Sequence, residues 1–474
     1  MIPNNKDKFN VLEGNLTKTI LILGWPIALS SVIQTFYNLV DAYWLGKLGR
    51  AQLSAPFISF QLIFFIVSFA IGFATAGTSL VAQYTGAEDS LKARKVTGQI
   101  LVFLTGFVFL LSFVGYLFAT PLLNLLKTPS DAFLYTRGYL KTMLLGLVFS
   151  VPFFVYQGVL NGYGDTKSPL KVQFITVVLN LILDPIMIFG WFGFPAMGVI
   201  GAAIATIISR GLASAIGIYE LFSGKRGIKL ILSCLLPDIE IIKKIIKIGL
   251  PVSFGMAGSS LGFIIIQGVI NTLGSAVVAA AGIGFRMVHL FMLPALGISA
   301  AITTIVGQSL GADKLQRAKD SVMKGLFIIL GFLIPTMILT AFAGRYIMIF
   351  FIPHDPLVQN IGRQMFYIVS PSVIFFAIFR IYAGVFQGSG HTMPVMVSSL
   401  LRIWLVRLPL LWLFIIKMSM GHFGVWWSML FSNIFTVIFI FILYLKGSWQ
   451  KPVIKGKISR KEIEVEELIE DANG

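Results

Sequence analysis

Two acidic side chains lie deep inside apolar stretches of this sequence. Asp184 stands within LNLILDPIMIF, residues 179–189, and Asp41 stands within QTFYNLVDAYWLG, residues 34–46. All other Asp and Glu residues fall in loops, at the ends of apolar segments or in tails. A carboxylate at the centre of a membrane helix costs roughly 2.5–3.5 kcal/mol, and acids retained there commonly serve a cation or proton pathway. We therefore favour a functional cation site over a purely structural hydrogen-bonded pair.

Asp41 is the last of four polar residues spaced at i, i+3, i+4 and i+7. This spacing places Gln34, Tyr37, Asn38 and Asp41 on one face of a helix. Inside a membrane segment, such a polar stripe should face protein or water rather than lipid. Pro26, about two turns earlier, removes one backbone hydrogen bond and permits a bend. We interpret Pro26 as a conformational hinge.

A similar stripe surrounds the second acid. One face of its apolar segment carries Gln173, Thr176, Asn180 and Asp184. Pro185 has no N–H group, which leaves the carbonyl oxygen of Leu181 available. Carboxylate, amide and carbonyl oxygens are hard ligands that suit a small cation such as Na⁺, and the same groups can form a proton-binding network.

The sequence predicts one coupling site if the two acid-bearing helices meet. Its ligands for Na⁺ would be Asp41, Asn180 and Asp184. Thr206, in the following apolar segment, lies one turn past Ala202 and can reach this site. The coupling ion would be H⁺ or Na⁺.

Aromatic and amide side chains recur at helical spacing in a further segment, residues 135–162. Together with the stripe around Asp41, they are candidates to line a cavity for flat, apolar and often cationic molecules. Ordinary helix packing is the alternative explanation. The candidate cavity residues are Gln34, Tyr37, Asn38, Tyr139, Phe154, Gln157 and Asn161.

The composition defines the elements that must position these residues. Of 474 residues, 57% are hydrophobic and only 12% are charged, against roughly 25% charged in soluble domains. We therefore predict an all-α polytopic membrane protein with about twelve transmembrane helices of about 20 residues or more. The apolar segments span residues 17–45, 54–85, 96–121, 135–162, 168–190, 196–222, 243–272, 277–309, 322–344, 361–388, 393–417 and 422–446.

The two halves of the chain repeat each other. GWPIALSS (24–31) matches GLPVSFGM (249–256), and QGVLNGYGDT (157–166) matches AGVFQGSGHT (383–392). Six helices in each half make the repeats parallel, related by an axis along the membrane normal. This predicts two pseudo-symmetric six-helix lobes around a central cleft. The predicted parts are an N-terminal lobe (1–222), a cytoplasmic linker (223–240), a C-terminal lobe (241–446) and a cytoplasmic tail (447–474).

Lysine and arginine are placed unevenly along the chain. The formal net charge is +17, and most of the positive side chains lie at the N-terminus and in the even-numbered loops. The positive-inside rule then predicts a multi-pass protein of the cell (plasma) membrane with both termini in the cytoplasm. Because this placement accounts for the charge, we expect no nucleic acid partner.

The second half lacks the acids of the first. Asp41 aligns with Ile266, and near the place of Asp184 the second half offers Arg407. Arg402 and Arg407 are cations inside an apolar run, and we expect one or both to pair with backbone carbonyls or a lipid head group. No metal-ligand spacing, nucleophile motif or ATP-binding motif occurs, so we expect no enzyme activity and no cofactor. Transport would draw on an ion gradient.

Taken in order, these features resemble the MATE (multidrug and toxic compound extrusion) family. The resemblance covers nearly the whole chain and rests on the repeat, its paired prolines, QGVLNGYGDTK (157–167), NLILDP (180–185) and MGVIGAAIAT (197–206). Acids confined to the first half resemble the DinF-like branch, and the chain is similar to an archaeal MATE transporter. The resemblance implies that Asp41, Asn180, Asp184 and Thr206 form the cation site.

We expect a secondary active antiporter that exports organic, often cationic, compounds in exchange for H⁺ or Na⁺ by alternating access. Its partners would be small-molecule drugs and the lipid bilayer, and we expect a monomer. The alternative is a flippase for lipids or lipid-linked saccharides on a related fold. A flippase would use Arg380, Arg402 and Arg407 against a phosphate. A sensor or an integral enzyme would show no gradient-dependent flux.

Overall fold

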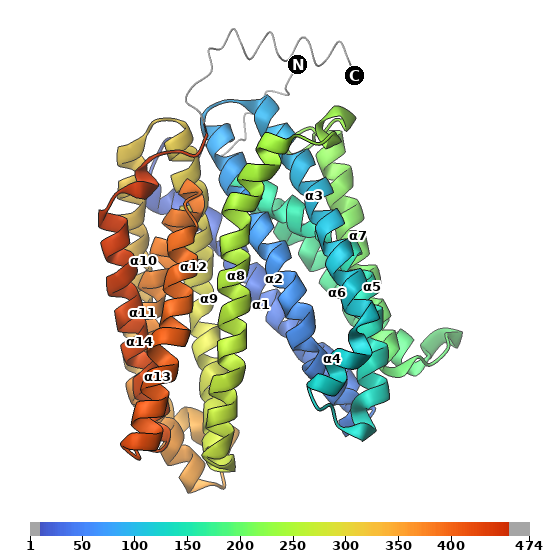
Figure 1. Cartoon of the computed structure of the whole chain (residues 1–474), viewed down its shortest axis with the longest axis vertical. Coiled ribbons are helices and arrows are strands. Elements are labelled where there is room, and N and C mark those ends of the chain that lie inside the picture. The colour runs from blue at the N-terminus through green and yellow to red at the C-terminus, as the bar shows by residue number, and fades with distance from the viewer. Residues whose placement is uncertain (1–9, 455–474) are drawn as a thin grey trace. The chain divides into compact units, whose positions relative to one another are not determined.

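The computed structural model describes residues 10–454, and every regular element in that range is helical (Figure 1). Twelve helical segments there are long and apolar enough to span a membrane. In lipid only a helix or a closed barrel satisfies its own backbone, so uninterrupted apolar runs fold as helices. The predicted all-α polytopic class is confirmed. Most of the predicted tail, beyond Ile454, lies outside the described residues.

The first half of the chain forms seven α-helices and one short 3₁₀ turn. They are α1 (Leu16–Gly46), α2 (Arg50–Gly86), α3 (Ser90–Leu117), α4 (Ala119–Leu125), α5 (Ser130–Tyr163), α6 (Lys167–Phe189), η1 (Trp191–Gly193) and α7 (Gly198–Ser223).

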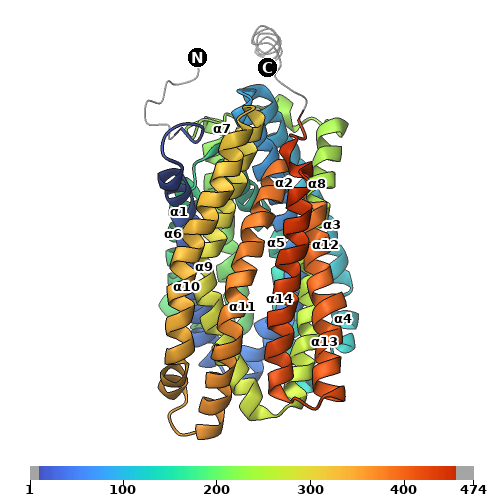
Figure 2. The same ribbon diagram turned by 90° about the vertical axis from the view of Figure 1, so that its left-hand side faces the viewer.

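The second half continues with η2 (Leu232–Leu235), α8 (Ile239–Thr272), α9 (Ser275–Gly311), α10 (Leu315–Phe351), α11 (Pro356–Ser389), α12 (Met393–Leu400), η3 (Leu401–Arg407), α13 (Leu408–Leu411), η4 (Trp412–Lys417), α14 (His422–Leu445) and η5 (Ser448–Gln450). Here α10, α11 and α14 run side by side, with α9 against α11 (Figure 2).

The described chain divides into two compact units. Unit 1 is built on Leu29–Ser253, and unit 2 combines Val11–Ala28 with Phe254–Val453. The divisions fall inside α1 and α8, so each unit contains half of a helix whose other half belongs to the other unit. Pro26 and Pro251 each lie close to one of these division points.

Equivalent contacts confirm the internal repeat. In unit 1 the Thr78 hydroxyl donates to the Gly158 carbonyl oxygen at 2.9 Å, and in unit 2 the Thr303 hydroxyl donates to that of Gly384 at 3.2 Å. A Cβ atom built on either glycine would lie 2.5–2.6 Å from a carbonyl oxygen of the facing helix. The pairs α2–α5 and α9–α11 therefore touch through their backbones at matching positions.

The helix boundaries follow local chemistry. Asp89 caps α3 by accepting from the Lys92 N–H at 2.9 Å, and Asp355 caps α11 by accepting from the Val358 N–H at 3.1 Å. The equivalent helices α5 and α11 both end on a glycine with positive φ, Gly164 at 101° and Gly390 at 79°. The helix ends in a left-handed backbone conformation at this position, and glycine adopts that conformation without a steric penalty.

The segment between α7 and α8 packs against unit 1. The Gln99 side-chain amide of α3 donates to the carbonyl oxygens of Cys234 at 2.8 Å and Leu236 at 2.6 Å, and its oxygen accepts from the Asp238 N–H at 2.8 Å. The neighbouring Gly98 permits this approach, because a Cβ atom there would lie 2.2 Å from the Cys234 carbonyl oxygen. Gln99 thus holds η2 against α3.

At the start of the same segment, Arg226 forms a two-point ion pair with Glu220. The distances are 3.0 Å from Nε to Oε2 and 2.7 Å from Nη2 to Oε1. The Tyr156 hydroxyl also donates to Glu220. The hydrogen bond to Glu220 raises the pKa of Arg226 above its usual value. Both ends of the segment are therefore fixed to unit 1.

We expect Gln99→Ala to release this segment and expose the thiol of Cys234, the only cysteine of the chain. Cys234 is 1% exposed and should resist a thiol reagent in the folded wild type. Three lost hydrogen bonds, each worth about 0.5–1.5 kcal/mol, should raise its labelling rate at least about tenfold. The measurement is the rate of maleimide labelling in detergent. Gln316→Ala, at an exposed glutamine, is the matched control. Equal labelling rates in wild type and Gln99→Ala would contradict the clamp.

Candidate functional site

The two membrane acids meet inside unit 1. Asp41 on α1 and Asp184 on α6 interact directly through their side chains. One turn before Asp184, Asn180 donates from Nδ2 to Asp184 Oδ1 at 3.3 Å. Asn180 and Asp184 are 1% and 0% exposed, and Asp41 is partly buried. Asn180 and Asp184, one turn apart on α6, therefore form one half of the site, and Asp41 of α1 forms the other half.

A tyrosine and a threonine link a third helix to this acid pair. The hydroxyls of Tyr37 on α1 and Thr206 on α7 share a buried hydrogen bond of 2.7 Å. Tyr37 also interacts with the carboxyl group of Asp41, one turn further along α1. Thr206 thus reaches the acids through Tyr37, and α1, α6 and α7 all contribute to the cluster.

Three oxygen atoms of the cluster have no hydrogen-bond partner among the described residues. They are Asp41 Oδ1, Asn180 Oδ1 and Asp184 Oδ2, and all three are buried. Buried acceptors without a partner are costly, and most are satisfied in native proteins. A set of carboxylate and amide oxygens fits Na⁺ coordination, and the adjacent carboxyl groups equally fit proton binding.

Apolar side chains close one side of the site. Tyr139 of α5 lies near both carboxyl groups and belongs to a buried cluster with Met143, Ile188 and Val199. Packing of this kind excludes water and lowers the local dielectric constant, so charge on the acids has large effects on their neighbours. The site therefore has one polar lining and one apolar wall.

Sequence reasoning missed one charged residue of this region. Arg210 of α7 lies within electrostatic reach of Asp41, Tyr37 and Tyr139. It stands one helical turn past Thr206 in the same apolar run, and this i, i+4 spacing was the signal that could have identified it. A fixed positive charge thus lies near the acid pair.

The other predicted residues are distributed along α1 and α5. Gln34 and Asn38 bond to each other at 3.2 Å, and Asn38 is exposed. Phe154, Gln157 and Asn161 are partly buried. They begin about 22 Å beyond Tyr139 along α5, at 1.5 Å per residue. Their assignment to a substrate cavity stays a prediction.

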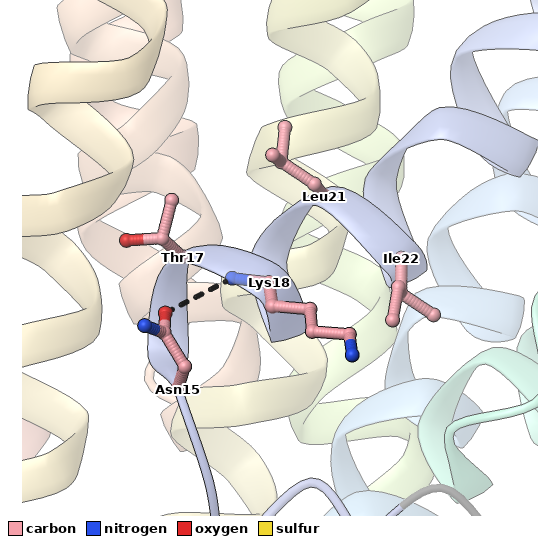
Figure 3. Close-up of a pocket in the computed structure, with 5 residues that line it drawn as sticks. All are labelled: Asn15, Thr17, Lys18, Leu21 and Ile22. Atoms are coloured by element: carbon pink, nitrogen blue, oxygen red, sulfur yellow. Dashed lines mark hydrogen bonds between the residues drawn. The ribbon is translucent and has the colours of Figure 1, made fainter.

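A separate pocket of about 370 Å³ lies at the first turns of α1 (Figure 3). It is lined by Asn15, Thr17, Lys18, Leu21 and Ile22, and the Asn15 side chain accepts from the Lys18 N–H at 3.3 Å. None of these residues is acidic, and the pocket includes no member of the acid cluster. We do not assign the transport site to it.

Parallel six-helix repeats and ionisable residues buried inside membrane-spanning helices are typical of membrane transporters. The model of the MatE family matches residues 26–186 and 251–413, and the chain belongs to this family. The two matches begin at Pro26 and Pro251, which are equivalent in the repeat. The protein is accordingly a multi-pass membrane transporter for small molecules and not an enzyme.

Similar proteins are found across bacteria and archaea. The probable multidrug resistance protein NorM of Thermotoga maritima is 28% identical over 456 residues, covering 94% of this chain and 96% of that protein. An FAD transporter of Shewanella oneidensis is 26% identical over 411 residues, and this match covers 85% of this chain and 89% of that transporter. The structure of a MOP superfamily transporter from Pyrococcus furiosus superimposes with a TM-score of 0.83 at 23% identity, covering 93% and 98% of the two chains.

Proposed function

We propose that this protein is a secondary active antiporter that exports organic, often cationic, compounds in exchange for H⁺ or Na⁺. The observation that carries the proposal is the group of buried, unpartnered oxygens on Asp41, Asn180 and Asp184. The name of the Thermotoga maritima relative supports drugs as the substrate class. The uneven placement of Lys and Arg supports a plasma membrane location with both termini in the cytoplasm.

In this mechanism the coupling ion enters from outside and binds between Asp41 and Asp184. Binding lowers the negative charge of the acid pair by one and changes the interaction of Asp41 with Tyr37, which carries the change to Thr206 on α7. A bend of α1 at Pro26 follows and weakens substrate binding. By linkage, substrate binding from the cytoplasm weakens ion binding to the same degree.

The test is efflux of a cationic dye from proteoliposomes under a pH gradient or a Na⁺ gradient, each imposed separately. We expect efflux under one gradient only, at a rate well above that of protein-free liposomes, and that gradient identifies the ion. Efflux that needs neither gradient would contradict coupled antiport.

The second candidate function is a flippase for lipids or lipid-linked saccharides. Buried arginines in unit 2 favour it, and the FAD transporter shows that a relative carries a phosphorylated anion. Lipid translocation in the same liposomes, unaffected by Asp41→Asn, would support the flippase instead.

A further inference from the structure

Unit 2 contains a cluster of arginines inside its membrane-spanning helices. Arg380 lies on α11, and Arg402 and Arg407 lie on η3. Arg402 is 6% exposed and Arg407 is 1% exposed, whereas Arg380 is partly exposed. The segment η3 is a π-helix, a wider turn that occurs frequently at functional sites. Guanidinium groups remain charged in proteins, so this cluster places positive charge within the apolar region.

The hydrogen-bond partners of these arginines are neutral. Asn433 Oδ1 accepts from Arg407 Nη2 at 2.9 Å and from Arg402 Nη1 at 3.4 Å. The Asn433 amide is held in this orientation because its Nδ2 donates to both oxygens of Ser372. Arg407 Nε donates to Ser432 at 2.8 Å. The fixed amide oxygen thus draws two like charges together without neutralising either.

Two donors of the cluster have no acceptor in the described part of the chain. Among the described residues, Arg380 Nε and Arg402 Nε are buried and make no hydrogen bond. Aromatic rings cover the guanidinium planes instead: Phe376 lies 4.6 Å from Arg402, and Phe263 lies 5.8 Å from Arg407. Stacking stabilises a guanidinium group but leaves its edge N–H donors available. These N–H groups can therefore donate to an oxyanion that lies in the plane of the guanidinium group.

Unit 2 supplies no carboxylate to this cluster. The acidic residues of unit 2 are Glu13, Asp313, Asp320 and Asp355, and each lies in a loop or near the start of a helix. Asp355 already caps α11, and Asp320 accepts from Gln316 at 2.8 Å. An uncompensated buried charge is strongly destabilising, so a cluster of three without a counterion calls for a ligand that supplies the negative charge.

We propose that Arg380, Arg402 and Arg407 form a binding site for a phosphate group carried by an amphipathic molecule. Guanidinium groups match phosphate through paired N–H donors, and the rings of Phe376 and Phe263 would contact the apolar part next to the phosphate. Arg380 and Phe376 are partly exposed and give the phosphate a route to the cluster. The phosphate belongs to a membrane lipid or to a soluble phosphorylated compound.

The test uses full-length protein in phosphatidylcholine nanodiscs and two pairs of probes. The first pair is FMN and riboflavin, which differ by one phosphate, measured by fluorescence anisotropy. The second is phosphatidic acid and diacylglycerol, which also differ by one phosphate, measured as lipid retained in native mass spectrometry. We expect at least about tenfold selectivity for the phosphate-bearing probe in one pair. The pair that responds identifies a soluble phosphate or a lipid head group as the source.

Arg380→Gln is the decisive variant, because this side chain makes no hydrogen bond among the described residues and its loss should spare the fold. We expect Arg380→Gln and Arg402→Gln to lower phosphate-selective binding at least about tenfold. Arg363→Gln, at an exposed arginine of the same helix α11, should leave binding unchanged. Absence of selectivity in the wild type, or selectivity that survives both cluster variants, would overturn the proposal. The measurement needs no ion gradient, so its result is independent of the coupling proposed for Asp41 and Asp184.

Discussion

Asp184→Asn should abolish gradient-driven efflux, with the rate at least about tenfold below wild type, while the protein remains folded. The amide keeps the size of the carboxyl group but removes the charge that holds the cation and the group that takes up the proton. A hydrogen bond or cation contact to a charged group is worth about 1.5–3 kcal/mol, which exceeds a tenfold change in binding. Because Asp184 Oδ2 has no partner among the described residues, losing the charge should cost little stability.

The same reasoning applies to Asp41→Asn, since both carboxyl groups belong to one interacting pair. The double variant should be no worse than either single variant, because one lost acid already disables the site. Asp131→Asn makes the same chemical change at an exposed position in the first turn of α5 and serves as the control. The measurements are initial dye efflux under the effective gradient and the thermal unfolding midpoint in detergent. Full efflux by Asp184→Asn would exclude this pair as the coupling site.

Gly201→Ala should disrupt the site without touching any of its polar atoms. A Cβ atom at Gly201 would lie 2.4 Å from the Met187 carbonyl oxygen and 3.0 Å from the Ile188 nitrogen. Both are backbone atoms of α6, so α7 must move away from α6 to admit a methyl group. That movement shifts Thr206 away from Tyr37 and Arg210 away from Asp41. Overpacking of this kind costs about 1–3 kcal/mol, and we expect a lower unfolding midpoint and a large loss of efflux.

The control for this variant lies on the same helix. A Cβ atom at Gly211 would meet only the Phe149 Cβ at 3.9 Å, an ordinary van der Waals contact. Gly211→Ala should be neutral or slightly stabilising, because alanine favours a helix by about 1 kcal/mol over glycine. Efflux and unfolding midpoints are measured for both variants. If Gly201→Ala behaves like Gly211→Ala, close packing of α6 and α7 is not needed for function.

The sequence predicted the helices well because an apolar run in lipid has few alternatives to a helix. The segment predicted as 135–162 is α5, Ser130–Tyr163, and the one predicted as 361–388 is α11, Pro356–Ser389. The helices extend past the apolar runs, because polar first turns and caps such as Asp355 also adopt helical geometry. The segment predicted as 393–417 contains π-helical turns, and its apolar pattern carries no signal for them.

Periodicity predicted part of the acid cluster. It placed Asn180 with Asp184, and Tyr37 with Asp41, on common faces. It could not separate Tyr37, which is buried, from Asn38, which is exposed, because both fall within the same broad face. The contact between Tyr37 and Thr206 depends on how α1 and α7 cross, which no local pattern specifies. Arg210 was missed because its proximity to Asp41 likewise depends on how α1 and α7 pack.

The exchange of half-helices between the two units has a consequence for how the chain can be divided. A cut in the segment between α7 and α8 would leave the N-terminal fragment without Ile239–Ser253, which completes unit 1. The C-terminal fragment would lack Val11–Ala28, whose Gly24 approaches the backbone of Gly297 closely. Neither fragment would contain a whole unit. We therefore expect the two halves to fold as separate chains only when they are expressed together, because each fragment carries the half-helix that completes the other unit.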